Sequence, residues 1–87
     1  MDRKLQDLVS VGPATIKDMH RLGIFGVHDL IGQNPYELYD RISELDSVKH
    51  DLCVIDVFAC AIAQARDPQL PEEQKQWWYW TQVRKNK

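Results

Sequence analysis

The sequence predicts an all-α fold that is organised around a helical hairpin near the N-terminus. Three observations support it: proline and glycine bracket an amphipathic segment at residues 8–24 (LVSVGPATIKDMHRLGI), Asn34-Pro35 marks a helix start, and residues 52–63 are almost continuously apolar. With 87 residues, 44% hydrophobic and 28% charged, the chain is expected to form one small globular fold rather than a disordered chain.

The hairpin turn is predicted at Ser10 to Gly12. Pro13 suits the first position of the next helix, because its missing N–H would be unpaired there anyway. Gly23 can take the left-handed conformation that ends this helix. The apolar side chains that share one stripe of the helix are Ala14, Ile16, Met19 and Leu22. Residues 2–8 are expected to form the short preceding helix, with Leu5, Leu8 and Val9 toward the core.

A second helix start lies at Asn34 and Pro35, which suit the cap and the first helical position. One helical turn over residues 27–31 is expected before it. The helix should run to about Glu44, and its predicted buried stripe is Leu38, Ile42 and Leu45, with Tyr39 at the edge.

The central core element is predicted at residues 52–63, where Asp56 is the only residue that is not apolar. Such a helix must be buried almost all round. Asp46 or Ser47 can cap it, and the Asp-Pro pair at 67–68 ends it. With the helix before it, this element would form a second, degenerate hairpin and a pseudo-twofold pair with the first.

The C-terminal part carries another helix start at residues 70–73 (LPEE), with an early proline and two acids in the first turn. It leads into a Trp-rich helix whose last four or five residues are expected to fray. We therefore predict a hairpin domain over residues 1–66 and an aromatic, basic segment over residues 67–87 that packs on the same domain.

The hairpin segment, followed by VHDL, resembles the helix-hairpin-helix module of DNA-binding proteins, in which an apolar residue and GxG precede a helix. Over nearly the whole chain, four segments in order resemble the small bacterial "pathogenicity locus" proteins: this hairpin, NPYELYDRI, DLCVIDVFACA and a WW-containing tail. The resemblance implies a compact, SAM-like helix-hairpin-helix fold. It supplies no biochemical activity, because the family is named for where its genes lie.

The charge is unevenly distributed along the chain. Residues 1–28 hold four basic and three acidic side chains, residues 29–56 hold two and seven, and residues 57–87 hold five and three. The acidic middle would repel a phosphate backbone. Any nucleic-acid surface should therefore join the hairpin end to the C-terminal end.

The N-terminus lacks an apolar leader segment, and no run approaches the roughly 18 apolar residues that span a bilayer. A cytoplasmic location without a membrane partner is therefore expected. Cys53 and Cys60 are seven residues apart, about 10.5 Å along a helix, which is too far for a disulfide between them. Reduced, buried thiols are predicted.

The hairpin predicts sequence-independent binding of a DNA or RNA phosphate backbone, because unpaired N–H groups and the helix dipole favour an anion at a helix N-terminus. The predicted nucleic-acid-binding residues are Ser10, Val11, Gly12, Thr15, Lys17 and Lys4. Two departures weaken this binding: Ser10 stands where the motif commonly has glycine, and Ala14 where related hairpins often carry a basic residue. The alternative is a hairpin that serves folding or protein contact.

The aromatic run at residues 77–80 (WWYW) has two interpretations. Its rings, followed by Arg84, Lys85 and Lys87, could stack bases and hold phosphates. Packing is favoured, because Trp77 and Trp80 at a spacing of three can cover the central helix. Trp78, on the opposite face, is the ring most available for a protein partner or for base stacking.

No pattern of an enzyme, cofactor site or metal site is found. His20, His28, His50, Cys53 and Cys60 lack a recognisable zinc spacing. Asp56 is expected to find a hydrogen-bond partner, for instance a Trp or Tyr of the tail, rather than to act as a functional acid. The sequence thus favours a nonenzymatic protein that binds nucleic acid weakly, with a protein-interaction or self-association module as the alternative.

Overall fold

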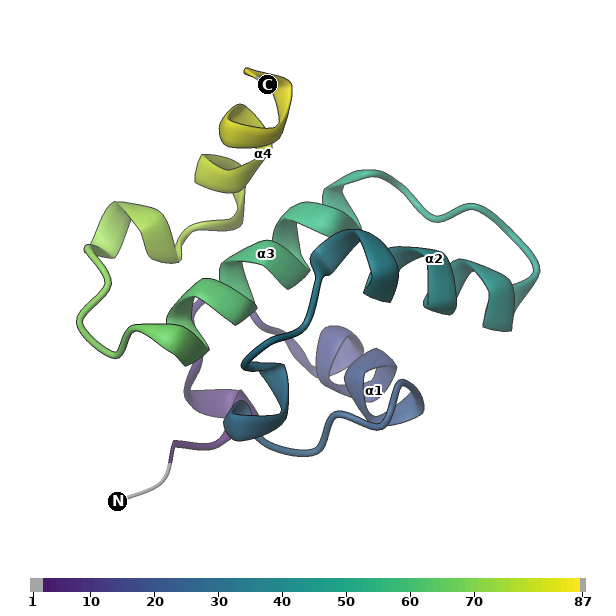
Figure 1. The fold of residues 1–87 in the computed structure, drawn as a ribbon, viewed down its shortest axis with the longest axis horizontal. Helices are drawn as coiled ribbons and strands as arrows, with labels where there is room; N and C mark the ends of the chain where they lie inside the picture. Colours follow the sequence, from purple (N-terminus) through teal and green to yellow (C-terminus); the bar gives the residue numbers. More distant parts are fainter. Residues whose placement is uncertain (1–2, 87) are drawn as a thin grey trace.

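The fold is built around α3 (Cys53–Arg66), as the apolar run predicted. The computed structural model describes residues 3–86 and is helical, with no strand in that range. Figure 1 shows α3 crossing the middle of the molecule, and both α2 (Pro35–Asp46) and α4 (Trp77–Lys85) contact it. Eight residues of α3 are buried: Ile55, Asp56, Phe58, Cys60, Ala61, Ile62, Gln64 and Ala65.

The segment predicted as the first hairpin contains a short 3₁₀ turn, η1 (Leu5–Asp7), followed by α1 (Pro13–Arg21). The predicted start at Pro13 is confirmed, and Gly23 lies just past the helix end with φ of +84°. The η1 turn is shorter than the helix predicted over residues 2–8, and residue 2 lies outside the described range. The predicted core position of Val9 is wrong, because Val9 is exposed after the end of η1. On the predicted stripe of α1, Ala14 is exposed, whereas Ile16 packs against the core and Met19 and Leu22 are buried.

The α2 helix begins as its sequence predicts. The side chain of Asn34 accepts hydrogen bonds from the N–H groups of Tyr36 (2.8 Å) and Glu37 (3.3 Å). The helical turn expected before α2 is η2 (Val27–Leu30). The predicted burial of Leu45 is wrong, because this side chain is 56% exposed while Tyr39, expected at the edge, is 7% exposed. The interface with α3 follows the fully buried pair Leu38 and Ile42 along the i, i+4 row, and Leu45 lies off that row.

The junction between α2 and α3 differs from the prediction. Asp46 is the last residue of α2, and Ser47 ends that helix in the left-handed conformation with φ of +56°, so neither residue caps α3. Instead, the Asp51 carboxylate accepts a hydrogen bond from the Cys53 N–H (3.2 Å) at the start of α3. The loop over residues 47–52 contains no glycine and no proline, unlike the first hairpin. The pseudo-twofold relation between the two hairpins stays a prediction.

The C-terminal segment contains two helical pieces instead of the single helix that the sequence predicted. A 3₁₀ turn, η3 (Glu72–Lys75), is separated from α4 by Gln76, whose backbone is extended. The Lys75 carbonyl accepts hydrogen bonds from Ser10 and Cys60 at this point, so long-range contacts divide the helix. The C-terminal residues expected to fray are helical as far as Lys85.

Among residues 3–86, no helix combines the length and the apolar character that crossing a membrane requires.

Candidate nucleic-acid interface

The N-terminus of α1 presents free backbone N–H groups to solvent. Gly12 is its N-cap with an extended backbone, and Pro13 occupies the first helical position. Among residues 3–86, the N–H groups of Gly12, Ala14 and Thr15 have no hydrogen-bond acceptor, and both Gly12 and Ala14 are exposed. The Val11 N–H, one residue earlier, also has none in that range. This is the helix-end geometry that the sequence predicted, and it suits an anion.

The turn before α1 is held by Ser10 at a positive φ of 67°. The steric penalty expected for a non-glycine residue with a positive φ is thus present at Ser10. The Ser10 hydroxyl donates to the Lys75 carbonyl (3.0 Å) and accepts from the Trp77 N–H (3.2 Å). These two bonds offset the backbone strain and join the hairpin turn to the start of α4.

Gln64 fixes the other side of the same turn. Its side-chain oxygen accepts from the Val9 N–H (2.9 Å), and its amide nitrogen donates to the Val9 carbonyl (2.8 Å). Gln64 is 3% exposed, so its side-chain amide would be costly to bury without these bonds. Sequence reasoning missed this residue, although a polar side chain two helical turns after Asp56, on the same stripe of α3, was the available signal.

Two of the four basic side chains in the N-terminal region are held by hydrogen bonds or ion pairs, and two have no acidic partner within residues 3–86. Arg3 donates to the carbonyls of Gln64 (2.8 Å) and Ala65 (3.1 Å) at the end of α3. Arg21 pairs with Asp18 and Asp46, and the hydrogen bond with Asp46 contributes most to raising the pKa of its guanidinium. Lys4 and Lys17 are exposed and have no acidic partner within residues 3–86.

Two rings at the start of α4 are accessible. Trp78 is 49% exposed, as its predicted availability requires. The predicted packing of Trp77 is wrong, because its side chain is 41% exposed while its backbone N–H is directed to Ser10. Trp80 does pack: its indole N–H donates to the Gln74 carbonyl (2.8 Å), and its ring meets that of Tyr79 edge-on at 5.3 Å.

Asp56 has hydrogen-bond partners in the fold, as predicted, but they are not the expected Trp or Tyr of the tail. It is 1% exposed and accepts hydrogen bonds from the Thr81 hydroxyl (2.7 Å) and from Nε (2.8 Å) and Nη2 (3.1 Å) of Arg84. The hydrogen bond that Arg84 donates to Asp56 is the main cause that raises the pKa of the Arg84 guanidinium. Arg84 is therefore engaged within the fold, whereas Lys85 is exposed and Lys87 lies outside the described residues.

The histidines and cysteines have separate surroundings. His20 stacks on Phe25 with ring centres 5.2 Å apart, and His50 Nε2 lies 2.6 Å from the Asp46 carboxylate. Both thiols are free: Cys60 is buried as predicted, but Cys53 is only partly buried. Within residues 3–86, no group of three or more His, Cys, Asp or Glu side chains is placed to hold a metal ion.

Comparison with known proteins gives a consistent result over almost the full chain. Residues 2–86 match the family model described as "Pathogenicity locus". The mitomycin resistance protein McrB of Streptomyces lavendulae is 35% identical over 81 residues, which cover 93% of this chain and 73% of that protein. No solved structure gives a significant match. The family match includes the hairpin turn, α3 and the Trp-rich helix alike.

Proposed function

The chain belongs to the pathogenicity locus family, and from this premise we propose that it is a nonenzymatic protein that binds the nucleic-acid phosphate backbone weakly and without sequence preference. The observation that carries the proposal is the exposed N-terminus of α1, where the N–H groups of Gly12, Ala14 and Thr15 have no acceptor in the described part of the chain. These groups and the positive end of the helix dipole favour a phosphate oxygen.

The number of basic side chains without an acidic partner among residues 3–86 sets the expected affinity for nucleic acid. Lys17 lies in the second turn of α1, Lys4 precedes η1, and neither has an acidic partner within the described residues. Two or three phosphate contacts predict a slope of log K against log salt of roughly −2 to −3, far below that of a strong DNA-binding protein. The acidic residues 29–56 restrict the contact to this end of the molecule.

Binding should be measured by fluorescence anisotropy with labelled duplex, single-stranded and branched DNA at low and moderate salt. Lys17→Glu is expected to weaken binding at low salt about tenfold, because it removes one contact and adds one repulsion. Lys49→Glu is the matched control, since Lys49 is also exposed but lies in the loop between α2 and α3. Absence of salt-sensitive binding at about 100 μM protein, where even weak non-specific complexes form, would exclude the function.

The printed name of the relative adds a cellular test of the same proposal. We propose that this chain, like the Streptomyces protein by its name, supports resistance to mitomycin. Expression in a mitomycin-sensitive host should raise survival, and the Lys17→Glu variant should raise it less. Equal survival with the original chain and with the Lys17→Glu variant would show that the cellular effect does not depend on phosphate binding.

The exposed rings of Trp77 and Trp78 favour a second candidate, a protein-interaction or self-association module. Sedimentation velocity over a wide concentration range distinguishes the two functions. A mass that rises with concentration, and falls back in a Trp78→Ala variant, supports self-association. A constant monomer mass excludes self-association through this ring.

A further inference from the structure

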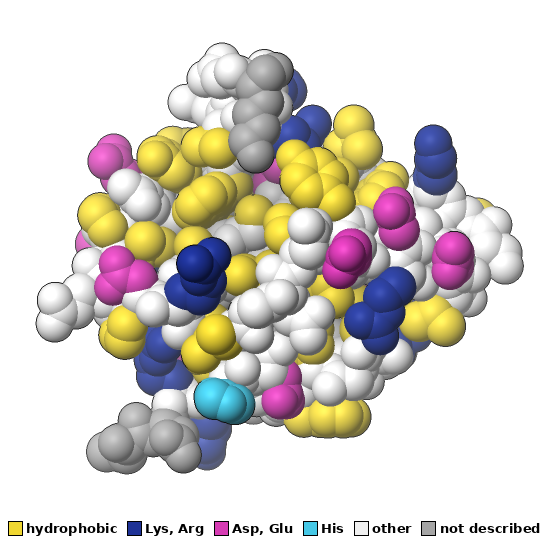
Figure 2. All heavy atoms as spheres, in the orientation of Figure 1, with side chains coloured by type: hydrophobic (Ala, Val, Ile, Leu, Met, Phe, Trp, Pro, Cys, Tyr) yellow, Lys and Arg dark blue, Asp and Glu magenta, His cyan; other side chains and the backbone are white. Residues whose placement is uncertain are grey.

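Small side chains on one face of α3 leave a groove beneath α4. Two hollows of about 130 and 180 Å³ meet there, and both are lined by Pro35, Ala59 and Trp80. Figure 2 shows hydrophobic side chains gathered over this face of the molecule. Apolar cavities of about 150 Å³ accept a benzene ring, so the hollow of about 180 Å³ has room for one aromatic group.

The walls of the groove are held in place by contacts already described. The Trp80 ring is oriented by its N–H bond to the Gln74 carbonyl, and Pro35 is fixed by the capped start of α2. Ala59 and Ala63 form the floor, one helical turn apart on α3. The space is thus shaped by ordered elements.

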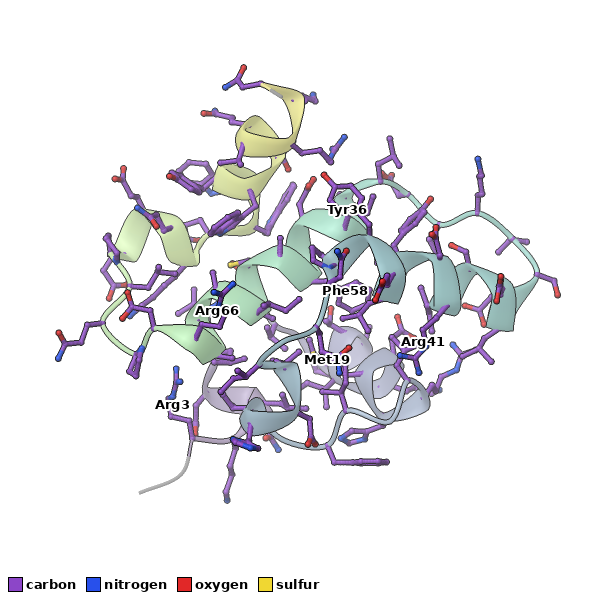
Figure 3. All side chains as sticks on the ribbon, in the orientation of Figure 1. Arg3, Met19, Tyr36, Arg41, Phe58 and Arg66 are labelled. Carbon is purple, nitrogen blue, oxygen red and sulfur yellow. The ribbon has the colours of Figure 1, made fainter. Side chains whose placement is uncertain are left out.

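The two ends of the groove differ in charge. At one end, Arg84 is neutralised by Asp56. At the other end, Arg66 is exposed and has no acidic partner among residues 3–86. Arg3 lies nearby, bonded to the last carbonyls of α3, which reduces the negative potential that this helix end would otherwise have. Figure 3 shows Arg66 at the C-terminal end of α3 and Tyr36 toward its N-terminal half.

We propose that this groove binds a small aryl carboxylic acid, with its ring between Pro35 and Trp80 and its carboxylate on Arg66. Apolar walls next to a guanidinium without an acidic partner among residues 3–86 select an apolar molecule with one anionic end. Ala59 and Arg66 are seven residues apart, about 10 Å along α3, which matches a ring joined to a carboxylate by a short alkyl chain. The site is separate from the N-terminus of α1 and does not depend on nucleic-acid binding.

The probe is 4-phenylbutyrate, followed by ¹H–¹⁵N NMR on the Trp80 indole N–H and on the backbone amides of residues 59–66. A Kd of about 1 mM or tighter is expected from the modest efficiency of a ligand of this size. The neutral 4-phenylbutyramide should bind about tenfold more weakly, and Arg66→Gln should weaken the acid by a similar factor, because each removes a charge-assisted contact. Lys49→Gln is the matched control and should leave the Kd unchanged.

Ala59→Leu is the steric test, since its extra atoms occupy the place of the ring and should abolish the shifts. Circular dichroism checks its fold, and the exposed Arg66→Gln variant provides an independent test if Ala59→Leu is destabilised. The proposal is overturned by the absence of saturable shifts at about 10 mM probe, well above the expected Kd. It is also overturned if acid and amide bind equally, or if Arg66→Gln and Lys49→Gln have the same Kd.

Discussion

Asp56 of α3 and Arg84 of α4 form an ion pair that is joined by two hydrogen bonds. The Asp56 side chain is buried, and the Arg84 side chain is 20% exposed. Thr81 completes the set of donors to this carboxylate. Asp56 would be costly to bury without these partners, so the pair fixes the position of α4 against α3. A residue that looked anomalous in an apolar helix thus determines where the C-terminal helix packs.

Replacement of Asp56 by Asn should lower the free energy of unfolding by about 2 kcal/mol, because the variant loses charge-assisted bonds from Arg84 at a buried position. Urea denaturation followed by circular dichroism measures the change. Asp40→Asn, at an exposed position of α2, is the control and should change stability by less than about 0.5 kcal/mol. Equal stability of the two variants would show that the ion pair does not hold α4.

Ser10 should respond differently to alanine and to glycine. Ser10→Ala removes both hydrogen bonds and keeps the strained φ, with an expected loss of about 2 kcal/mol. Ser10→Gly removes the bonds but relieves the strain, with a loss nearer 1 kcal/mol. Ser47 has a positive φ without a side-chain hydrogen bond among the described residues, so Ser47→Gly should gain about 0.5 kcal/mol. The reverse order for the Ser10 variants would contradict this explanation of the turn.

Asp46 should contribute to the loss of stability in acid. Its hydrogen bond with Arg21, and secondarily that with His50, lowers the pKa of its carboxyl below the ordinary value of 3.8. A depressed pKa in the folded state stabilises the protein above pH 3.8, and this contribution disappears as the pH falls through the folded-state pKa. Urea midpoints measured from pH 7 down to strongly acid pH should therefore fall less steeply for Asp46→Asn than for the original chain. Parallel curves would exclude this role.

The two thiols should react at very different rates. Burial raises the pKa of Cys60 to about 11, and its Sγ donates to the Lys75 carbonyl, whereas Cys53 is only partly buried. A disulfide reagent at pH 8 should modify Cys53 first and Cys60 only through opening of the fold. Asp56→Asn should accelerate the Cys60 reaction, and Cys53→Ala isolates it. Equal rates for both thiols would contradict the packing of Cys60.

Alkaline unfolding supplies the complementary pH test for Cys60. Because its pKa is raised from 9.0 to about 11 in the folded state, the neutral thiol stabilises the protein below pH 9, and this contribution is lost as the pH rises toward 11. Cys60→Ala should therefore show a smaller decrease in urea midpoint between pH 9 and pH 11 than the original chain. Identical decreases would assign the alkaline sensitivity to other groups.

The helix starts could be predicted from the sequence because their signals are local. Pro13 at the first position of α1 and Asn34 as the cap of α2 need only neighbouring residues to act, and both predictions are confirmed. The same local chemistry predicted the free amides of the candidate site. By contrast, Leu45 and Trp77 were misassigned, since their exposure depends on where α3 and Ser10 lie.

The support of the site could not be predicted, because it consists of contacts between distant parts of the chain. The Gln64 side chain meets Val9 across 55 residues, and no periodic pattern marks that pair. Arg84 was a candidate phosphate ligand in the sequence, whereas the fold pairs it with Asp56. A buried acid and a distant arginine each have several chemically reasonable partners, and only the packing of α4 selects between them.

The two hydrogen bonds between Ser10 and the Lys75–Trp77 segment also have a consequence for the order in which the parts of the chain fold during translation. The turn lies near the N-terminus, but one of its bonds needs Gln64 and another needs Trp77, 67 residues later. The ribosome therefore releases the turn long before the residues that shape it have been made. The candidate phosphate-binding turn emerges among the first segments of the nascent chain and is among the last to reach its final geometry.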